Sequence, residues 1–315
     1  GFQRWAPDLD EAQQLLSTDL TKQGDLARQE GKQGAAKQFY AESARIQEEL
    51  LRRHPGNPEY LRQLAISYDG RADVLLEEGD EPGARSLYEK ALSTVRQRSS
   101  KAPDEWYQRY LEALVISRLA DAARARGANQ DAEKFCAQAL ALARLVVAAE
   151  PQPTLYRLLL GQLNERLGSL YVQSGHLLEA RRSLDQALTL AHALADGDPD
   201  NRRHGLMLVQ TLMAIRRLAE AERDRPAARK AEEEAQKLRL HFAADRDDAL
   251  WQRELLDGHL HLFRLTDSAE ATRAHFENAE SILLDFQRAG SWENDLRVAD
   301  GWKKLREISE PKSFP

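Results

Sequence analysis

The sequence has a single cysteine, Cys136, among its 315 residues. One cysteine excludes a framework of intrachain disulfides and fits a reducing compartment, so we expect a cytoplasmic protein. No apolar run approaches the ~20 residues that a membrane-spanning helix needs, and the N-terminus lacks the basic-then-apolar pattern of a signal peptide. Membrane insertion is therefore not predicted. Because the chain begins without methionine, we also expect a piece of a longer protein with an attached effector domain.

An excess of charge of either sign is missing too. The 45 basic and 51 acidic side chains give a formal net charge of −6. No block of Lys and Arg with interleaved aromatic residues is present, so a nucleic-acid partner is not expected. Glycine and proline number only 17 and 11, while Ala, Leu, Arg, Glu and Gln are abundant, which favours helix almost throughout. The composition predicts an all-α fold with essentially no sheet.

Motifs for chemistry are also lacking. There is no Gly-rich phosphate loop, nucleophile elbow or His-Glu-x-x-His segment. His259 and His261 are two residues apart, so on a helix they diverge by about 200° and cannot share one ion. We therefore predict no metal, no cofactor and no catalytic residues, and an enzyme with an unrecognised site is the third interpretation of the chain.

What the sequence does contain is a repeat with a period of 48 residues. Alanine recurs at one place of the repeat and a small residue recurs seven places later, while glycine precedes the first alanine by five places and proline closes the unit. These residues are Ala36, Ala84, Ala132, Ala180 and Ala228; Ser43, Ala91, Ala139, Ala187 and Ala235; Gly31, Gly79, Gly127 and Gly175; and Pro55, Pro103, Pro151 and Pro199. A period of this length is typical of stacked two-helix units.

Each unit divides at its glycine into two amphipathic segments. In the fourth unit Leu163, Leu167 and Leu170 precede the glycine, and Ala180 and Leu184 follow it, with helical spacing on both sides. The glycine allows a helix to end in a left-handed conformation, and the alanine allows the paired helix to pack closely. The proline then ends the second helix.

This pattern resembles the tetratricopeptide repeat, in which a small residue, a large residue, an alanine, a second large residue and a second alanine stand at fixed places. The matching sets are Gly168, Tyr171, Ala180, Leu184 and Ala187; Ala72, Leu75, Ala84, Tyr88 and Ala91; Ala120, Ala123, Ala132, Cys136 and Ala139; and, as a weaker first copy, Gly24, Ala27, Ala36, Tyr40 and Ser43. The resemblance implies an α-solenoid of stacked antiparallel helix pairs. A fifth copy departs from the pattern, with Arg216 and Glu232 at core positions and Pro226 in its turn.

The unit is 14 residues longer than the family's ~34, which adds about two turns to each helix. We therefore expect helices of roughly 20 to 24 residues, similar to long-unit arrays of bacterial multidomain proteins. The predicted organisation is an extension at residues 1–9, five repeats at 10–248, and an atypical helical pair with a capping segment at 249–315. Phe276 replaces the next signature alanine there, and Trp292 and Trp302 are expected in the cap.

Carboxylates recur in the first helices of the units, at a place that faces the inner concave surface in the family's pattern. Two interpretations stay open: an acidic groove that attracts a basic peptide, or a solvated helix face. Apolar and basic side chains at neighbouring places would complete the surface. The candidate residues are Asp25, Arg28, Ile66, Asp69, Asp73, Leu76, Glu77, Leu114, Asp121, Arg124, Glu165 and Arg217. A chaperone-type clamp is not expected, because Asp69, Ser117 and Glu165 stand where Lys or Asn would be needed.

The sequence therefore predicts a non-catalytic scaffold that binds a protein or peptide segment and regulates or targets a larger signalling protein. The alternative is a self-assembly module, in which end units or ridges dock identical chains. Cys136 occupies the place of Tyr40, Tyr88 and Leu184 in the sister units. It is therefore interpreted as a buried small hydrophobe and not as a nucleophile.

Overall fold

A computed structural model describes residues 6–29, 31–99, 106–244, 249–288 and 299–304 of the chain. Within these residues the chain is helical and contains no strand, as the composition predicts. The helices, in order, are α1 (Ala6–Gln29), α2 (Gln33–Arg53), α3 (Pro58–Glu77), α4 (Glu81–Ser99), α5 (Trp106–Ala125), α6 (Asn129–Ala149), α7 (Thr154–Gln173), α8 (Leu177–Gly197), α9 (Arg202–Ala221), α10 (Arg225–Phe242), α11 (Ala249–Leu265) and α12 (Ala269–Arg288).

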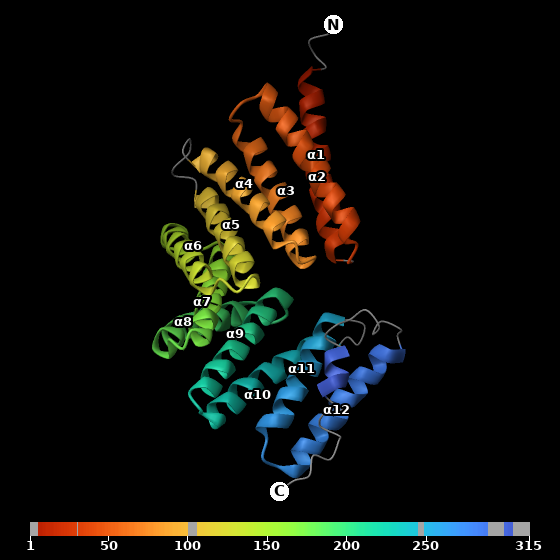
Figure 1. The fold of residues 1–315 in the computed structure, drawn as a ribbon, viewed down its shortest axis with the longest axis vertical. Helices are drawn as coiled ribbons and strands as arrows, with labels where there is room; N and C mark the ends of the chain where they lie inside the picture. Colours follow the sequence, from red (N-terminus) through yellow and green to blue (C-terminus); the bar gives the residue numbers. More distant parts are fainter. Residues whose placement is uncertain (1–5, 30, 100–105, 245–248, 289–298, 305–315) are drawn as a thin grey trace. The chain divides into compact units, whose positions relative to one another are not determined.

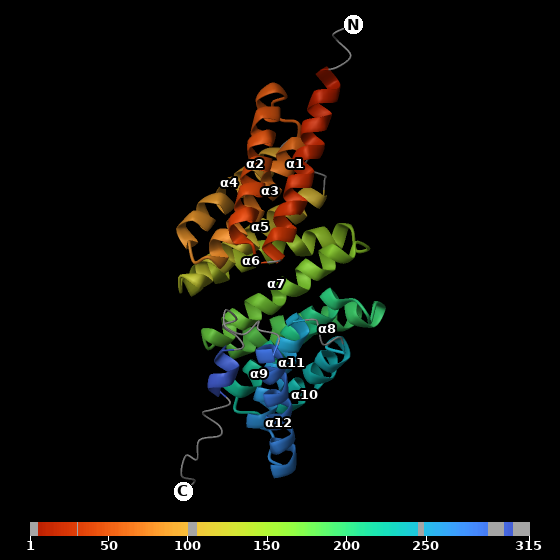
Figure 2. The same ribbon diagram turned by 90° about the vertical axis from the view of Figure 1, so that its right-hand side faces the viewer.

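From α1 to α6, and again from α8 to α12, each helix packs on the next one (Figures 1 and 2). Thus α1 packs on α2 and α3 on α4, while α2 also packs on α3 and α4 on α5. The chain divides into two compact units, Gly1–Leu163 and Asn164–Pro315. The boundaries predicted at residues 9 and 248 remain predictions, and α1 begins at Ala6.

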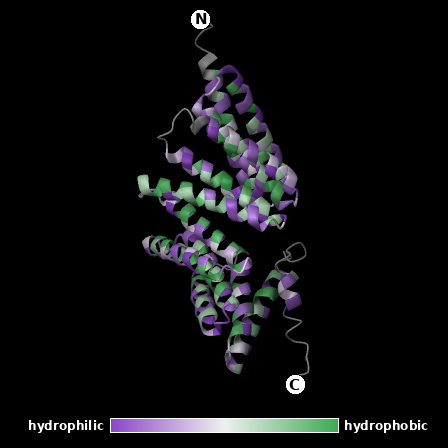
Figure 3. Cartoon of the chain, turned by 60° about the vertical axis from the view of Figure 1, so that its left-hand side comes forward, coloured by the Kyte–Doolittle hydropathy of each residue, from purple (hydrophilic) through white to green (hydrophobic). Residues whose placement is uncertain are grey.

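The longer unit gives long helices, as predicted. α2 and α6 have 21 residues and α3 and α5 have 20, whereas α10 and α11 are shorter, at 18 and 17. Hydrophilic and hydrophobic residues alternate along the helices in Figure 3, as expected of amphipathic helices packed on one side.

The repeated alanines lie at the helix contacts. Side chains at both signature places are completely buried in all five copies, and they are Ala36, Ala84, Ala132, Ala180 and Ala228, with Ser43, Ala91, Ala139, Ala187 and Ala235. A methyl group or a hydroxymethyl group is the largest side chain that these close contacts hold. This confirms the packing role predicted for the repeat.

The repeated glycines end the first helices in the left-handed region. Gly31, Gly79, Gly127 and Gly175 have φ between 74° and 85°. Arg223 takes the same place in the fifth copy and is forced to φ 62°. Asp224, the next residue, caps α10 by accepting a hydrogen bond from the Ala227 N–H at 3.0 Å.

The two charged residues of the fifth copy are buried in the core. Glu232 is fully buried, Arg216 is almost so, and Nε of Arg216 lies 2.8 Å from Oε2 of Glu232. The two residues that depart from the repeat pattern therefore form an internal ion pair. Each charge is compensated by its partner rather than by water.

α11 and α12, in the region predicted to be an atypical pair, pack on each other. Trp251, Leu256 and Leu283 are buried in a core that also includes Phe242 of α10. Trp302 packs against this cluster, whereas Trp292 lies outside the described residues; a capping role for this segment stays a prediction.

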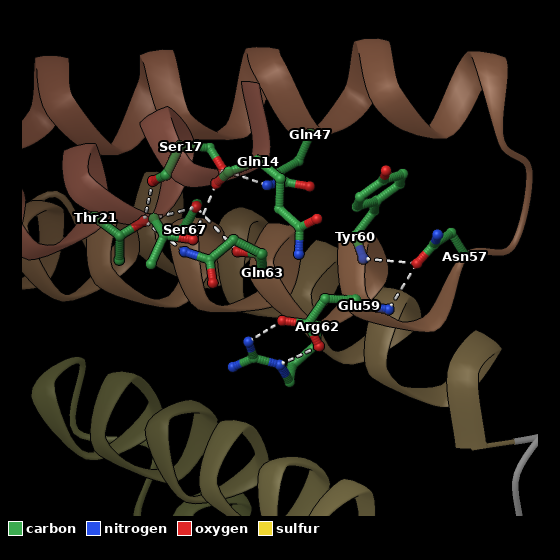
Figure 4. Close-up of polar contacts among 11 residues, drawn as sticks. Gln14, Ser17, Thr21, Gln47, Asn57, Glu59, Tyr60, Arg62, Gln63 and Ser67 are labelled. Carbon is green, nitrogen blue, oxygen red and sulfur yellow. Dashed lines mark hydrogen bonds and ion pairs between the residues drawn. The ribbon is translucent and has the colours of Figure 1, made fainter. Parts of the chain in front are cut away.

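A buried polar seam joins α1, α2 and α3 (Figure 4). The hydroxyl oxygen of Thr21 lies 2.9 Å from that of Ser43, which lies 2.8 Å from that of Ser67, and Gln63 donates to Thr21 at 2.9 Å. The seam is not repeated 48 residues later. The corresponding buried residues there are Ala65, Ala91, Val95, Leu111 and Val115.

Candidate functional site

The first helices of the first compact unit lie next to one another, since α1 packs on α3 and α3 on α5. Their shared surface, which we call the first-helix face, is defined by Asp25 and Arg28 of α1, Ile66, Asp69 and Asp73 of α3, and Tyr110, Leu114, Arg118 and Asp121 of α5. All but Asp73 keep some exposure to solvent. Seven of these nine side chains are among those that the sequence singled out.

The other predicted residues are placed less centrally. Leu76 is half-buried and packs on the apolar core between α3, α4 and α5. Glu77 and Arg124 are exposed near the C-terminal ends of α3 and α5. Glu165 of α7 and Arg217 of α9 belong to the second compact unit.

Two of the recurring aspartates accept hydrogen bonds from tyrosines of the paired helices. The Tyr40 hydroxyl donates to Oδ1 of Asp25 at 2.6 Å, and the Tyr88 hydroxyl donates to Oδ1 of Asp73 at the same distance. Burial and then the carboxylate partner raise the pKa of Tyr40. The spacing of 48 between these aspartates is therefore in part a structural requirement of the repeat.

Two arginines connect the three helices through Asp73. Nη1 of Arg28 donates to Oδ2 of Asp73 at 2.5 Å and lies 3.7 Å from Oε1 of Glu77. On the other side, Nε of Arg118 lies 3.5 Å from Oδ1 of Asp73, and its Nη1 lies 4.0 Å from Asp121. Basic and acidic groups thus alternate across α1, α3 and α5, so the face is not a uniformly acidic groove.

Asp69 differs from its neighbours. Its Oδ1 is buried and has no hydrogen-bond partner. Burial, and then the negative charge of Asp73, raise the pKa of this carboxyl to about 7, although Arg118 and Arg28 oppose the shift. The charge of Asp69 is therefore poorly compensated by the protein itself.

Toward its N-terminal end the face has apolar and aromatic side chains on α3 and α5. Ile66 and Leu114 occupy the same place of the repeat on α3 and α5, and both are half-buried. One turn before Leu114, the ring of Tyr110 lies 5.7 Å from that of Tyr107 and 5.3 Å from that of Tyr156. Aromatic side chains such as Tyr110 are enriched where proteins bind other chains.

Arg118 and Tyr110 belong to the face but were not predicted from the sequence.

The hydrogen bonds of Tyr40 to Asp25 and of Tyr88 to Asp73 do have a signal in the sequence, because each tyrosine follows its aspartate by 15 residues. The fourth copy, which has Leu184 in place of the tyrosine, has Ser169 in place of the aspartate. No comparable pattern indicated Arg118.

The structure also places the side chains considered for chemistry. Cys136 is buried, with an exposed fraction of 1%. Nδ1 of His259 lies 3.1 Å from Nδ1 of His275 on α12, and not beside His261. Among the described residues no group of three or more His, Cys, Asp and Glu side chains is arranged to hold a metal ion. None of the described helices combines the length and apolar character that crossing a bilayer requires.

Comparison with known proteins gives a match in structure alone. No family model and no curated protein sequence matches the chain. BtubC (BKLC) from P. vanneervenii matches with a TM-score of 0.57 and 18% identity, over 89% of this chain and 93% of that one. The S. pombe nuclear import adaptor Nro1 matches with the same TM-score and 10% identity, over 95% and 100%. A thermophilic TPR protein of Thermus thermophilus matches with a TM-score of 0.41 and 17% identity, over 78% and 99%.

The fold is that of a tetratricopeptide-like helical repeat. The in-register alanines, the glycine turns and the stacked pairs of helices establish this architecture from the chain itself, and the two matches at a TM-score of 0.57 agree with it.

Proposed function

We propose that the chain is a non-catalytic scaffold that binds an extended protein or peptide segment on the first-helix face. The observation that carries the proposal is the composition of this face, in which the partly exposed Ile66 and Leu114 lie on the same helices as Asp69 and Arg118. Stacked repeats hold such a surface rigid over several helices, which suits an extended ligand.

The apolar side chains of the face supply most of the affinity in this proposal. Exposed ion pairs contribute only ~0 to 1 kcal/mol each, so the charged side chains select the ligand more than they hold it. A bound segment would recruit or regulate a larger protein to which the chain is attached, in a cytoplasmic setting. The nuclear import adaptor Nro1 has a role of this general kind, although this chain resembles it in fold alone.

The test is to pan a random peptide library against the whole chain and to measure the enriched peptides on matched variants. Ile66→Asp with Leu114→Asp places charges on the face, whereas Leu145→Asp makes the same type of change at an exposed site on α6. We expect the double variant to lose binding by at least about tenfold and the control to retain it. Circular dichroism verifies that both variants remain helical. Peptides that bind the double variant as well as the original chain would refute the proposed face.

A second candidate function, self-assembly, is favoured by the outer side of α1. Leu15, Leu16 and Leu26 are 63%, 52% and 56% exposed, whereas Gln63, Leu64 and Val74, at the same places on α3, are buried. The difference arises because α2 packs on α3. Sedimentation at several concentrations distinguishes the functions: a dimer that Leu15→Glu and Leu26→Glu dissociate supports assembly, and a monomer throughout contradicts it.

A further inference from the structure

Oδ1 of Asp69 lacks a hydrogen-bond donor because of where this residue stands in the repeat. Thr21, its equivalent on α1, lies in the polar seam and contacts the hydroxyl groups of Ser43 and Ser67. The residues equivalent to those two serines on the next helices are Ala91 and Val115, both buried. At this place of the second repeat, the carboxylate of Asp69 therefore stands where the first repeat has a hydroxyl group. The neighbouring hydroxyl groups of the first repeat are replaced there by methyl groups.

The charges around Asp69 leave an excess of negative charge. Asp25 and Arg28 of α1, Asp73 of α3 and Arg118 of α5 act on it electrostatically, and Asp69 in turn acts on Tyr88 of α4. With Asp121 included, the face has four carboxylates against two guanidinium groups. Both guanidinium groups already contact Asp73, so neither compensates Asp69 fully.

An apolar contact lies one helical turn from Asp69. Ile66 precedes it by three residues on α3, a rise of about 4.5 Å along the helix. Alternate residues of an extended peptide point the same way and lie about 7 Å apart. An apolar residue and a residue two positions along such a peptide can therefore reach Ile66 and Asp69 together.

We propose that Asp69 receives the ammonium or guanidinium group of a bound protein segment, whose apolar residue two positions away packs on Ile66 and Leu114. This deepens the proposed function and rests on it. The occupant is thus an extended segment with an apolar-x-basic pattern. A cation at Asp69 compensates this carboxylate, which the protein alone does not do fully. Because the pKa of Asp69 is raised to about 7, binding of the cation displaces a proton near neutral pH.

The experiment uses the whole chain and four sets of immobilised peptides. The first set has Leu-x-Arg in a Gly-Ser background, the second has Leu-x-Glu, the third has Leu and Arg separated by six residues, and the fourth has Ser-x-Arg. We expect the first set to bind at least about tenfold more tightly than each of the other three sets at pH 8, because each of those sets lacks one of the two paired contacts. The affinity for the first set rises from pH 6 to pH 8 as Asp69 loses its proton.

Two variants at one position identify the carboxylate. Asp69→Asn retains the shape of the side chain but removes its charge. Asp69→Thr introduces the residue type that the first repeat has at the same place, Thr21. Both should bind the first and second sets equally and should lose the rise of affinity with pH. Glu89→Gln removes an exposed carboxylate from α4, outside the first-helix face, and should retain the preference and the pH dependence.

The outcomes separate this inference from the proposed function. A preference for Leu-x-Arg that survives in both Asp69 variants overturns the role of Asp69. If the first and second sets bind equally and both lose binding in the Ile66→Asp and Leu114→Asp variant, the preference for a basic residue is wrong. The proposed peptide-binding face is then still supported. If none of the four sets binds, and the library peptides bind equally well after the Ile66→Asp and Leu114→Asp changes, both the role of Asp69 and the proposed peptide-binding face are wrong.

Discussion

Arg239 and Glu232 form an ion pair that is removed entirely from solvent. Nη1 of Arg239 lies 2.5 Å from Oε1 of Glu232, and neither side chain is exposed. Arg216 of α9 contacts the other carboxylate oxygen at 2.8 Å. One carboxylate thus joins two guanidinium groups inside the second compact unit, so the loss of Glu232 removes a close counter-charge from both arginines at once.

Removing Glu232 alone should therefore lower the free energy of unfolding more than removing all three charged residues together. We expect Glu232→Ala to lower the free energy of unfolding by about 3 to 5 kcal/mol, because Arg216 and Arg239 stay buried. The triple variant Arg216→Met, Glu232→Leu and Arg239→Met should lose less, since apolar side chains carry no desolvation cost. Urea unfolding followed by circular dichroism measures both. A cost below about 1 kcal/mol for Glu232→Ala would mean that water solvates the arginines.

The turn at Arg223 offers a stabilising substitution. Arg223 has φ 62°, where the sister repeats have glycine. Arg223→Gly should raise the free energy of unfolding by about 0.5 to 1 kcal/mol, because relief of the strained backbone exceeds the entropy that glycine loses. The matched change Gly175→Ala should lower it by a similar amount, since no heavy atom lies within 4 Å of the added Cβ and only the backbone is affected. Opposite shifts of the two urea midpoints verify this; equal shifts would contradict it.

The signature alanines should not tolerate larger side chains. Ala132 of α6 is completely buried, so Ala132→Leu should overpack the contact and cost about 1 to 3 kcal/mol. Ala137→Leu changes an exposed alanine on the same helix and serves as the control, with an expected effect within about 0.5 kcal/mol. The urea midpoints measure the difference. Equal midpoints for both variants would remove the packing model.

The fold was predictable because its contacts recur at a fixed interval. Ala36 and Ala84 make equivalent contacts in successive units, and Gly31 and Gly79 make equivalent turns, so one structural requirement is written several times in the sequence. The ion pairs of the site do not recur at this interval. Arg118 reaches Asp73 from another helix, 45 residues away, and its sister residue Gly70 has no charge. Single events of this kind depend on rotamers and on neighbouring helices, which a period does not encode.

The buried charges of the fifth copy show the same limit. Arg216 and Glu232 are residue types usually found at the surface, and only the stacking of α9 on α10 shows that they neutralise one another inside the protein. The sequence located the places correctly, since both residues stand at core positions of the repeat. The chemistry that fills those places required the three-dimensional structure.

The last prediction concerns acid stability and the pair His259 and His275. His259 is 6% exposed, and burial, followed by the charges of His275 and Arg239, lowers its pKa to about 4. The unfolded chain, with a histidine pKa of about 6.5, binds more protons than the folded chain between pH 6.5 and pH 4. The contribution of His259 to stability is thus complete above pH 6.5 and is lost as the pH falls, by on the order of 3 kcal/mol at pH 4.

Urea unfolding of the original chain and of His259→Gln, at intervals from pH 7.5 to pH 4, tests this contribution. The variant has no imidazole to protonate, so the difference in unfolding free energy between the two proteins should shrink or reverse as the pH falls through 6.5. His176→Gln removes an exposed imidazole from the start of α8 and is the control. Because His259 packs beside His275 on α12, the change should be largest for the part of the chain that contains α11 and α12. A difference that stays constant across this range would show that His259 is protonated with equal ease in the folded and unfolded chain, and the burial argument would then be wrong.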